Sequence, residues 1–363
     1  MTNAAVEVIR SRKREHVELA LAASSQTTTP AGWDDVQLVP AALPQLSIED
    51  IDLSIELVGR TLAAPVAIAA MTGGHDDAVE LNAVLGAAAE QLGLAIGVGS
   101  QRAALADRSL ERSFAAVRDR APTAFVIGNI GACQLVEQRG ARRLTASEVD
   151  HLVDMIGADA MAVHLNVVQE LVQTEGDRNF SALIDAIGEL VTNCAVPVVV
   201  KETGAGLSRG DAAALASVGV AAVDVGGSGG TSFARIEASR AERVGDERGT
   251  RLGTTFADWG IPTAASVLEV RRCGLPVVAT GGVRNGLDAA KALALGATAV
   301  GLGRPAMVAA QRGEAALVAE LELVIEELRM ALLLTGARTA ADLPAPVLSG
   351  FTLEWAKQRD LGA

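Results

Sequence analysis

The chain has 363 residues, of which 50% are hydrophobic and 37 are glycine, so it can bury one large core or two smaller ones. Its 31 basic and 44 acidic residues give a formal net charge of -13, which argues against a nucleic-acid partner or an anionic membrane surface. No apolar run approaches the roughly 20 residues that cross a bilayer, and the start lacks the apolar core of a secretion signal. We therefore expect a cytoplasmic protein without a membrane partner, in which a local basic cluster binds any anionic ligand.

Eight short apolar segments recur along the chain, and most of them precede a stretch of helical period. In chain order they begin at Pro65, Ala95, Ala124, Ala160, Pro197, Ala221, Pro276 and Ala299. Apolar strands that alternate with helices predict an α/β protein with a parallel sheet, and eight of them favour a (β/α)8 TIM barrel. We assign residues 65–363 to this barrel and residues 1–64 to an N-terminal arm and extension. An open doubly wound sheet is the alternative.

Polar and glycine residues follow nearly every predicted strand. The segment AVHLNVVQE, from Ala162 to Glu170, begins as a buried strand and then places His, Asn, Gln and Glu close together. In a barrel these strand ends converge on one face, which is where such folds keep their active sites. The sequence therefore predicts one pocket built from eight segments. His164 taken alone is equally consistent with a buried core histidine.

Two consecutive strand ends have the features of a phosphate site. Gly281 and Gly282 end the seventh strand just before a helix, and Gly303-Arg304 ends the eighth just before another. Glycine lets the backbone approach an anion, and a following helix directs N–H groups at it. Barrels frequently hold a phosphate between these two loops. Lys201, at the end of VPVVVKE, is a separate candidate that could hold an electron-rich cofactor, form a Schiff base or pair with Glu202.

Several longer segments together resemble one known family, the type 2 isopentenyl diphosphate isomerases. They are RKREH at Arg12, HLNVVQE at His164, VKETGAGLSRG at Val200, DVGGSGGTSFARIE at Asp224 and ATGGVRNGLDAAKALALGA at Ala279. The resemblance covers nearly the whole chain. It implies an FMN-dependent (β/α)8 isomerase of isoprenoid biosynthesis, which interconverts isopentenyl and dimethylallyl diphosphates by adding one proton and removing another. It also implies reduced FMN, Mg2+ and NADPH as the reductant.

The resemblance implies a flavin site, residue by residue. The residues expected to contact FMN are Ala70, Met71, Thr72, Ser100, Asn129, Lys201, Gly226, Thr231, Gly282, Val283, Arg284, Gly303 and Arg304. The last five surround its phosphate and neighbouring atoms. Lys201 is expected near the electron-rich end of the ring system, where a cation stabilises the anionic reduced form.

The resemblance also implies the substrate and metal contacts. The diphosphate is expected at Arg12, Lys13, Ser100, Gln101 and Arg102, with Mg2+ held by Glu170. The implied catalytic residues are His164, Asn166 and Gln169, of which Gln169 also contacts the substrate. Because an amide is a poor acid or base, we expect Gln169 to orient or relay a proton rather than to act alone.

Three expectations concern the whole molecule. The resemblance implies a homo-oligomer, either a tetramer or an octamer. We expect the N-terminal arm and residues 230–272 to act as lids that order when diphosphate binds. The second hypothesis for the function is an FMN-dependent 2-hydroxy-acid oxidase or dehydrogenase, which needs a histidine base after the later strands. No histidine follows His164, which argues against it.

Overall fold

Eight parallel strands close into a barrel in the computed structural model, which describes residues 3–362 and the side chains from Ser11 onward. Closure is completed by β11, which pairs with β4 so that Val300 lies opposite Val66. The predicted (β/α)8 barrel is therefore confirmed, and the open sheet is excluded. The strands, each beginning within one of the predicted segments, are β4 (Val66–Ile68), β5 (Ala95–Gly97), β6 (Phe125–Gly131), β7 (Ala160–Leu165), β8 (Val198–Glu202), β9 (Ala222–Asp224), β10 (Val277–Thr280) and β11 (Ala299–Leu302).

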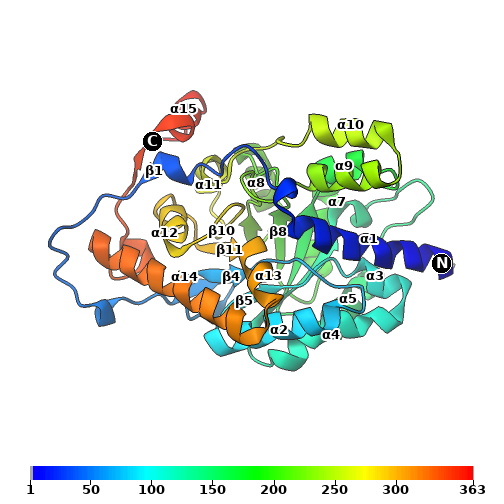
Figure 1. The fold of residues 1–363 in the computed structure, drawn as a ribbon, viewed down its shortest axis with the longest axis horizontal. Coiled ribbons are helices and arrows are strands. Elements are labelled where there is room, and N and C mark those ends of the chain that lie inside the picture. The colour runs from blue at the N-terminus through cyan, green and yellow to red at the C-terminus, as the bar shows by residue number, and fades with distance from the viewer. Residues whose placement is uncertain (1–2, 363) are drawn as a thin grey trace.

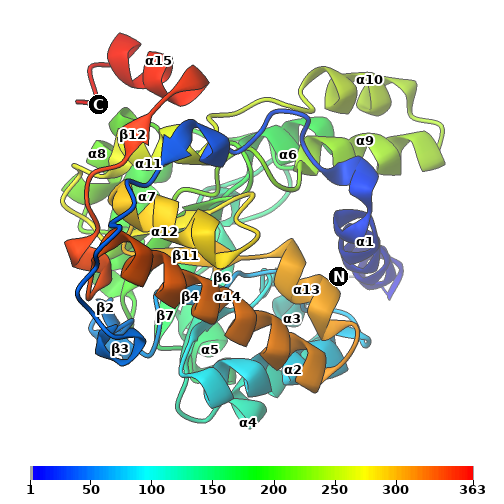
Figure 2. The same ribbon diagram turned by 60° about the vertical axis from the view of Figure 1, so that its left-hand side comes forward.

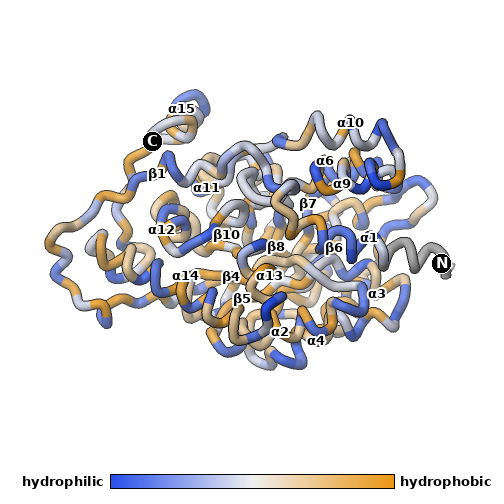
Figure 3. The backbone as a smooth tube through the Cα atoms, viewed as in Figure 1, coloured by the Kyte–Doolittle hydropathy of each residue, from blue (hydrophilic) through white to orange (hydrophobic). Residues whose placement is uncertain are grey.

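Helices surround the barrel, as Figures 1 and 2 show. Hydrophobic stretches gather around β4 and β5 in Figure 3, whereas α9 carries hydrophilic ones. The helices that follow the strands are α2 (Ala78–Leu92), α3 (Arg102–Ala106), α4 (Glu111–Arg120), α5 (Ala146–Ile156), α6 (Val167–Val172), α7 (Leu183–Asn193), α8 (Arg209–Ser217), α9 (Phe233–Arg243), α10 (Glu247–Thr255), α11 (Thr263–Val270), α12 (Gly286–Ala294), α13 (Arg304–Ala310) and α14 (Glu314–Thr335). In residues 3–362 no helix is long and apolar enough to cross a membrane.

Local sequence signals set the ends of these helices. Helix α5 begins after Thr145, whose side chain accepts a hydrogen bond from the Glu148 N–H while Glu148 bonds back, and it ends at Gly157 in the left-handed conformation. Helix α12 begins after Asn285, whose side chain accepts from the Asp288 N–H. Such a cap stabilises a helix by about 1 kcal/mol, and here it fixes where the turn after β10 ends.

A short hairpin closes the end of the barrel where the strands begin. It consists of β2 (Ile55–Leu57) and β3 (Arg60–Leu62), paired antiparallel. Leu57 and Leu62, each 2% exposed, pack against the strand residues Ala67, Ala95, Phe125, Ala160 and Ala299. Burying each leucine stabilises the fold by roughly 1.5–3 kcal/mol. This end is therefore packed core, and the opposite end is left for a binding site.

The rest of the N-terminal extension runs along the barrel to its open end. Helix α1 (Asn3–Leu21) contacts α3, α9 and α13 and crosses the barrel opening in Figure 1. Farther along, β1 (Val36–Gln37) pairs antiparallel with β12 (Val347–Leu348), which precedes α15 (Gly350–Gln358). The extension is thus joined to the C-terminal segment as well as to the barrel.

The predicted lid over residues 230–272 is wrong in its second half. Helix α9 contacts α1 and α10 packs on α9, but all eight residues of α11 are buried. Helix α11 is therefore a fixed helix of the barrel wall, because exposing its apolar face would cost much of the core packing.

Candidate active site

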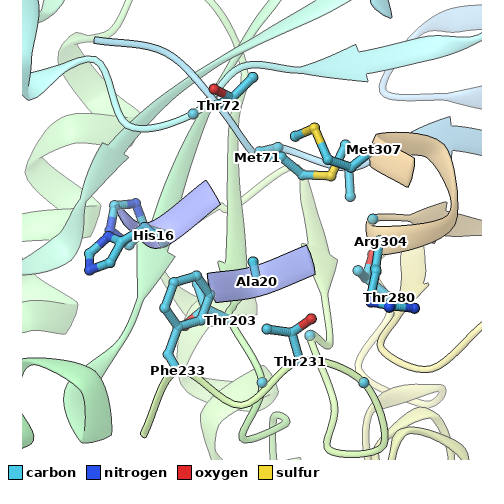
Figure 4. Close-up of a pocket in the computed structure, with 18 of the residues that line it drawn as sticks. His16, Ala20, Met71, Thr72, Thr203, Thr231, Phe233, Thr280, Arg304 and Met307 are labelled. Atoms are coloured by element: carbon cyan, nitrogen blue, oxygen red, sulfur yellow. The ribbon is translucent and has the colours of Figure 1, made fainter. Parts of the chain in front are cut away.

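A cavity of about 490 Å³ lies at the carboxyl ends of the strands, under α1. Each of the eight barrel strands, or the loop directly after it, contributes to its lining. Figure 4 shows Met71 and Met307 on one side of this space and His16 with Phe233 on the other. The predicted site residues that line it are Arg12, Lys13, Ala70, Met71, Thr72, Ser100, Arg102, Asn129, His164, Asn166, Gln169, Glu170, Lys201, Gly226, Thr231, Gly282, Val283, Arg284, Gly303 and Arg304.

Gln101 is the exception among the predicted residues, because its side chain does not reach the cavity. It is fully buried, donates to the Leu152 carbonyl at 2.9 Å and accepts from the Asn129 N–H at 2.8 Å. Both ends of the amide are thus occupied by the barrel wall. The expected contact between the Gln101 side chain and substrate is therefore not made. Gln101 instead holds the backbone of Asn129, which does line the cavity, in place.

The turn after β10 is shaped to receive an anion. Gly281 and Gly282 have φ values of 120° and 66°, which favour glycine, and a Cβ on Gly282 would lie 2.5 Å from the Gly229 carbonyl oxygen. Val283 is 3% exposed, and in residues 11–362 no group accepts a hydrogen bond from its N–H. A buried N–H without a protein partner is costly unless a ligand accepts from it. The arginines Arg284 and Arg304 line the cavity beside this turn.

The floor of the cavity is formed by β6, β7 and β8. His164 Nδ1 lies 2.9 Å from Asn129 Oδ1, and burial, together with Lys201 and Lys13, lowers the pKa of His164 to about 3. The ring is therefore uncharged at neutral pH. Lys201 Nζ donates to the backbone carbonyl of Glu202 at 2.8 Å. The expected alternative of a Lys201–Glu202 ion pair is not seen, because the Glu202 carboxylate instead accepts from the N–H groups of Gly204, Ala205 and Gly206.

A cluster of two amides and a carboxylate extends from β7 into α6. Asn166 Nδ2 donates to Gln169 Oε1 at 3.2 Å and to Glu170 Oε1 at 2.9 Å. Glu170 Oε2 accepts from the Asp177 N–H at 2.7 Å, and burial raises the pKa of Glu170. Asn166 Oδ1 is buried and has no hydrogen-bond partner in residues 11–362. One buried oxygen of this cluster is therefore left without a protein partner.

Glu237 of α9 is a functional candidate that the sequence reasoning missed. Its Oε1 accepts from Gln169 Nε2 at 3.2 Å and lies 2.7 Å from His16 Nε2. Burial alone would raise the pKa of Glu237, but the hydrogen bond and charge of His16 and the charge of Arg240 outweigh it and hold that pKa below its usual range. The carboxylate is thus ionised while 2% exposed. The one sequence feature that could have identified Glu237 is its position at the end of the GGTSFARIE segment.

Helix α1 brings basic side chains over the cavity. Lys13 Nζ donates to the Ser100 carbonyl at 2.5 Å, and burial, helped by the charge of Arg12, lowers the pKa of Lys13 to about 7. Arg12 lies 3.7 Å from Glu175. At the other end of the helix, Arg304 Nη2 donates to the Leu21 carbonyl at 2.9 Å. A residue of the predicted phosphate site therefore also fixes the end of α1.

Other lining residues escaped the sequence analysis because their signals were weak. Gln173 lies one helical turn beyond Gln169, and Phe233 contacts the His16 ring edge to face, with the ring centroids 6.0 Å apart. Met307 and Thr280 enter from α13 and from the end of β10. In the sequence, an apolar residue such as Met307 or a threonine at a strand end cannot be distinguished from an ordinary core residue.

Comparisons with known proteins agree with this geometry. A family model described as FMN-dependent dehydrogenase matches residues 137–349. The isopentenyl-diphosphate delta-isomerase of Methanosarcina mazei is 46% identical over 351 residues, which are 96% of this chain and 94% of that protein. The protein of the same name from Halobacterium salinarum is 44% identical and covers 96% of each chain.

Among solved structures, similarity extends to flavin enzymes of other activities. A flavocytochrome b2 with sulfite bound has a TM-score of 0.66 at 19% identity, over 97% of this chain and 86% of that chain. A mandelate oxidase with a monooxide FMN adduct has a TM-score of 0.55 at 19% identity, over 94% and 95%. At these identities the likeness shows the barrel fold alone, so the closer sequence relatives decide between isomerase and oxidase. Because it shares well over 40% of its residues with them along nearly its whole length, the chain belongs to the isopentenyl-diphosphate delta-isomerase family and to the FMN-dependent barrels.

Proposed function

We propose that this protein interconverts isopentenyl and dimethylallyl diphosphates on reduced FMN, with Mg2+ bound and NADPH as the reductant. One observation carries the proposal. A single cavity joins a glycine turn suited to a cofactor phosphate, two basic residues of α1 suited to a diphosphate, and the hydrogen-bonded cluster of Asn166, Gln169 and Glu170.

The reaction demands an unusual environment, because an alkene is a feeble base and its protonation develops positive charge at a tertiary carbon. Catalysis needs a dry pocket without a fixed cation beside that carbon. His164 meets this condition, since its pKa of about 3 keeps the ring neutral at the floor of the cavity. A charged imidazole in that place would repel the developing charge.

The diphosphate end would be held by three basic residues, one of which gains charge when the diphosphate binds. Lys13, with a pKa of about 7, is partly uncharged in the free protein at neutral pH. A nearby diphosphate raises that pKa and makes the ammonium ion the bound form. Arg12 and Arg102 add guanidinium groups, and Arg102 is oriented by Asp177 at 3.2 Å.

The metal would be held by Glu170, beside which the buried Asn166 Oδ1 has no hydrogen-bond partner in residues 11–362. Mg2+ prefers oxygen ligands and usually takes only one or two from the protein when a phosphate supplies the rest. In residues 11–362 no cluster of three or more His, Cys, Asp or Glu side chains could hold a metal by itself. The donor set therefore fits a metal that arrives with the diphosphate.

The flavin would be held at its phosphate by the turn from Gly281 to Val283 with Arg284 and Arg304, and at its ring by residues from β4 to β9. When bound and reduced, FMN supplies an electron-rich surface and an exchangeable proton. Lys201 places an ammonium group in the cavity and is faced by Asp224, whose pKa burial raises. A cation at Lys201 would stabilise the negative charge of the reduced ring.

Gln169 would move or orient a proton together with Glu237. The Gln169 amide donates to the ionised Glu237 carboxylate, which is also bound to His16, so the amide is fixed in one orientation. An amide can accept a proton at its oxygen and pass one on only if a neighbouring group accepts a proton from its N–H. Glu237 and His16 supply that partner pair.

Product analysis tests the proposal. The protein, FMN, NADPH and Mg2+ are incubated with isopentenyl diphosphate without oxygen, and the two diphosphates are separated by chromatography. We expect dimethylallyl diphosphate to form, and omission of NADPH, FMN or Mg2+ to stop it. Glu170→Gln should keep FMN bound but require far more Mg2+. Bound FMN without product in the complete mixture would refute the proposal.

A further inference from the structure

Trp33 reaches from the N-terminal extension to the glycine turn after β10. Its indole Nε1 donates to the Gly282 carbonyl at 3.1 Å, and the side chain is 5% exposed. Trp33 itself does not line the cavity, whereas Gly282 and Val283 do. The bond therefore contacts the turn from the side away from the cavity.

The geometry of a trans peptide connects this bond to the cavity. Residues 3–362 contain no cis peptide bond, so the Gly282 carbonyl and the Val283 N–H point in opposite directions across one planar unit. When Trp33 holds the carbonyl on the far side, the Val283 N–H is directed at the cavity that Val283 lines. This is the buried N–H for which no protein acceptor exists in residues 11–362.

Close packing leaves this turn little freedom in other respects. A Cβ on Gly282 would lie 2.7 Å from Ala31 Cβ, and one on Gly229 would lie 2.2 Å from Ala31 Cα. Three backbones, from the extension, the loop after β9 and the turn after β10, are thus stacked with only the Ala31 methyl group between them. Such a stack fixes where the turn lies, but in residues 11–362 the indole is the one donor to the Gly282 carbonyl.

The extension segment is anchored independently of the indole. Lys291 Nζ of α12 donates to the Trp33 carbonyl at 2.8 Å, and the Ala264 N–H donates to the Ala31 carbonyl at 2.9 Å. Figure 2 shows this part of the extension passing close to α11 and α12. Replacing the indole by a phenyl ring therefore removes one N–H donor while the anchors and most of the packing stay.

We infer that Trp33 is a positioning residue for the phosphate of the flavin: its indole orients the Gly282–Val283 peptide so that the Val283 N–H faces the anion. The inference rests on the proposed function, because it takes the cofactor phosphate to occupy this turn. It assigns part of the N-terminal extension to cofactor binding, although that segment contacts no ligand itself.

Paired flavin titrations test the inference. The full chain, freed of flavin, is titrated with FMN and with riboflavin, which lacks the phosphate, and quenching of flavin fluorescence gives each dissociation constant. In Trp33→Phe we expect the constant for FMN to rise about threefold to tenfold, the effect of one hydrogen bond, and that for riboflavin to change less than twofold. Trp355→Phe is the matched control, because the Trp355 Nε1 donates to Glu269 at 3.0 Å and neither residue lines the cavity. This variant should leave both dissociation constants unchanged.

The outcomes separate the inference from the function on which it rests. If the unaltered protein binds FMN no better than riboflavin, the proposed cofactor site is wrong. If the unaltered protein prefers FMN and Trp33→Phe keeps that preference, or weakens the binding of FMN and riboflavin equally, the inference is wrong while the function stands. Should Trp33→Phe fail to fold, Lys291→Met replaces it, since loosening the Trp33 backbone must lower the same preference for FMN.

Discussion

Gln169, which lines the cavity, is hydrogen-bonded to Glu237, although the two residues belong to α6 and α9 and are 68 residues apart in sequence. The sequence predicted Gln169 because it stands among other polar residues directly after a strand. It did not predict Glu237, whose partner arises only when α9 folds over the opening. The family resemblance implied a substrate contact for Gln101, and the sequence could not correct it, because a sequence does not show the direction in which a side chain points.

Substituting Gln169 tests the residue that we place at the reacting carbon. In Gln169→Ala we expect kcat to fall by a factor of about 10²–10⁴, the usual contribution of a positioned proton-transfer group. FMN content should be unchanged, because the turn after β10 is untouched. Gln311→Ala, at an exposed position, is the control. A fall of less than threefold in kcat would contradict the assignment.

The pH dependence of substrate capture follows from Lys13. Burial lowers its pKa from 10.5 to about 7, so the free protein loses this charge as the pH rises through about 7. We therefore expect kcat/KM to decline above that pH. Lys13→Arg keeps its charge at all accessible pH values, so its alkaline decline should shift upward. Identical profiles for the two proteins would show that Lys13 does not control the decline.

At the scale of elements, the eight strands were predictable because each is a short apolar run that ends in polar or glycine residues. The functions of α1 and α11 were less accessible. The basic cluster on α1 marked it as a ligand-binding arm, but the salt bridges that hold it in place involve residues from α9 and the loop after α6. Helix α11 lies within the long segment between β9 and β10, and only the structure shows that it is fully buried.

The attachment of α1 to α9 depends on Arg240. Its guanidinium group lies 2.9 Å from Glu15, 2.6 Å from Glu237 and 3.3 Å from Glu175, with 16% of the side chain exposed. In Arg240→Met we expect faster hydrogen exchange along α1 and a KM raised by about tenfold, since the buried Glu237 carboxylate loses a charged partner.

Arg243→Met is the matched control for that substitution. Arg243 lies on the same helix and pairs with Glu18 at 2.8 Å, but its side chain is 46% exposed. Such exposed pairs contribute about 0–1 kcal/mol, so exchange along α1 should stay nearly unchanged. Equal exchange in the two variants would mean that Arg240 does not hold the helix.

At the scale of the whole molecule, α14 presents an apolar face to solvent. Leu323, Met330 and Leu334 are 52%, 51% and 56% exposed and lie on one side of the helix. Large exposed apolar side chains that gather on one helix face are typical of an interface. We propose that α14 contributes to a homo-oligomer and expect Leu323→Glu with Leu334→Glu to lower the mass found by sedimentation velocity. Leu43→Glu, at a 79% exposed site in the extension, should leave the mass unchanged. If both variants dissociate, or if neither does, the proposal is contradicted.

The central claim is that the cavity adds and removes protons at an alkene without net oxidation. The most direct measurement is NMR of isopentenyl diphosphate incubated in D2O with the protein, Mg2+, FMN and NADPH in the absence of oxygen. We predict that deuterium enters the methyl groups of dimethylallyl diphosphate while far less than one NADPH is consumed per product. Consumption of one NADPH per product, or no deuterium in substrate or product although FMN is bound, would contradict the claim.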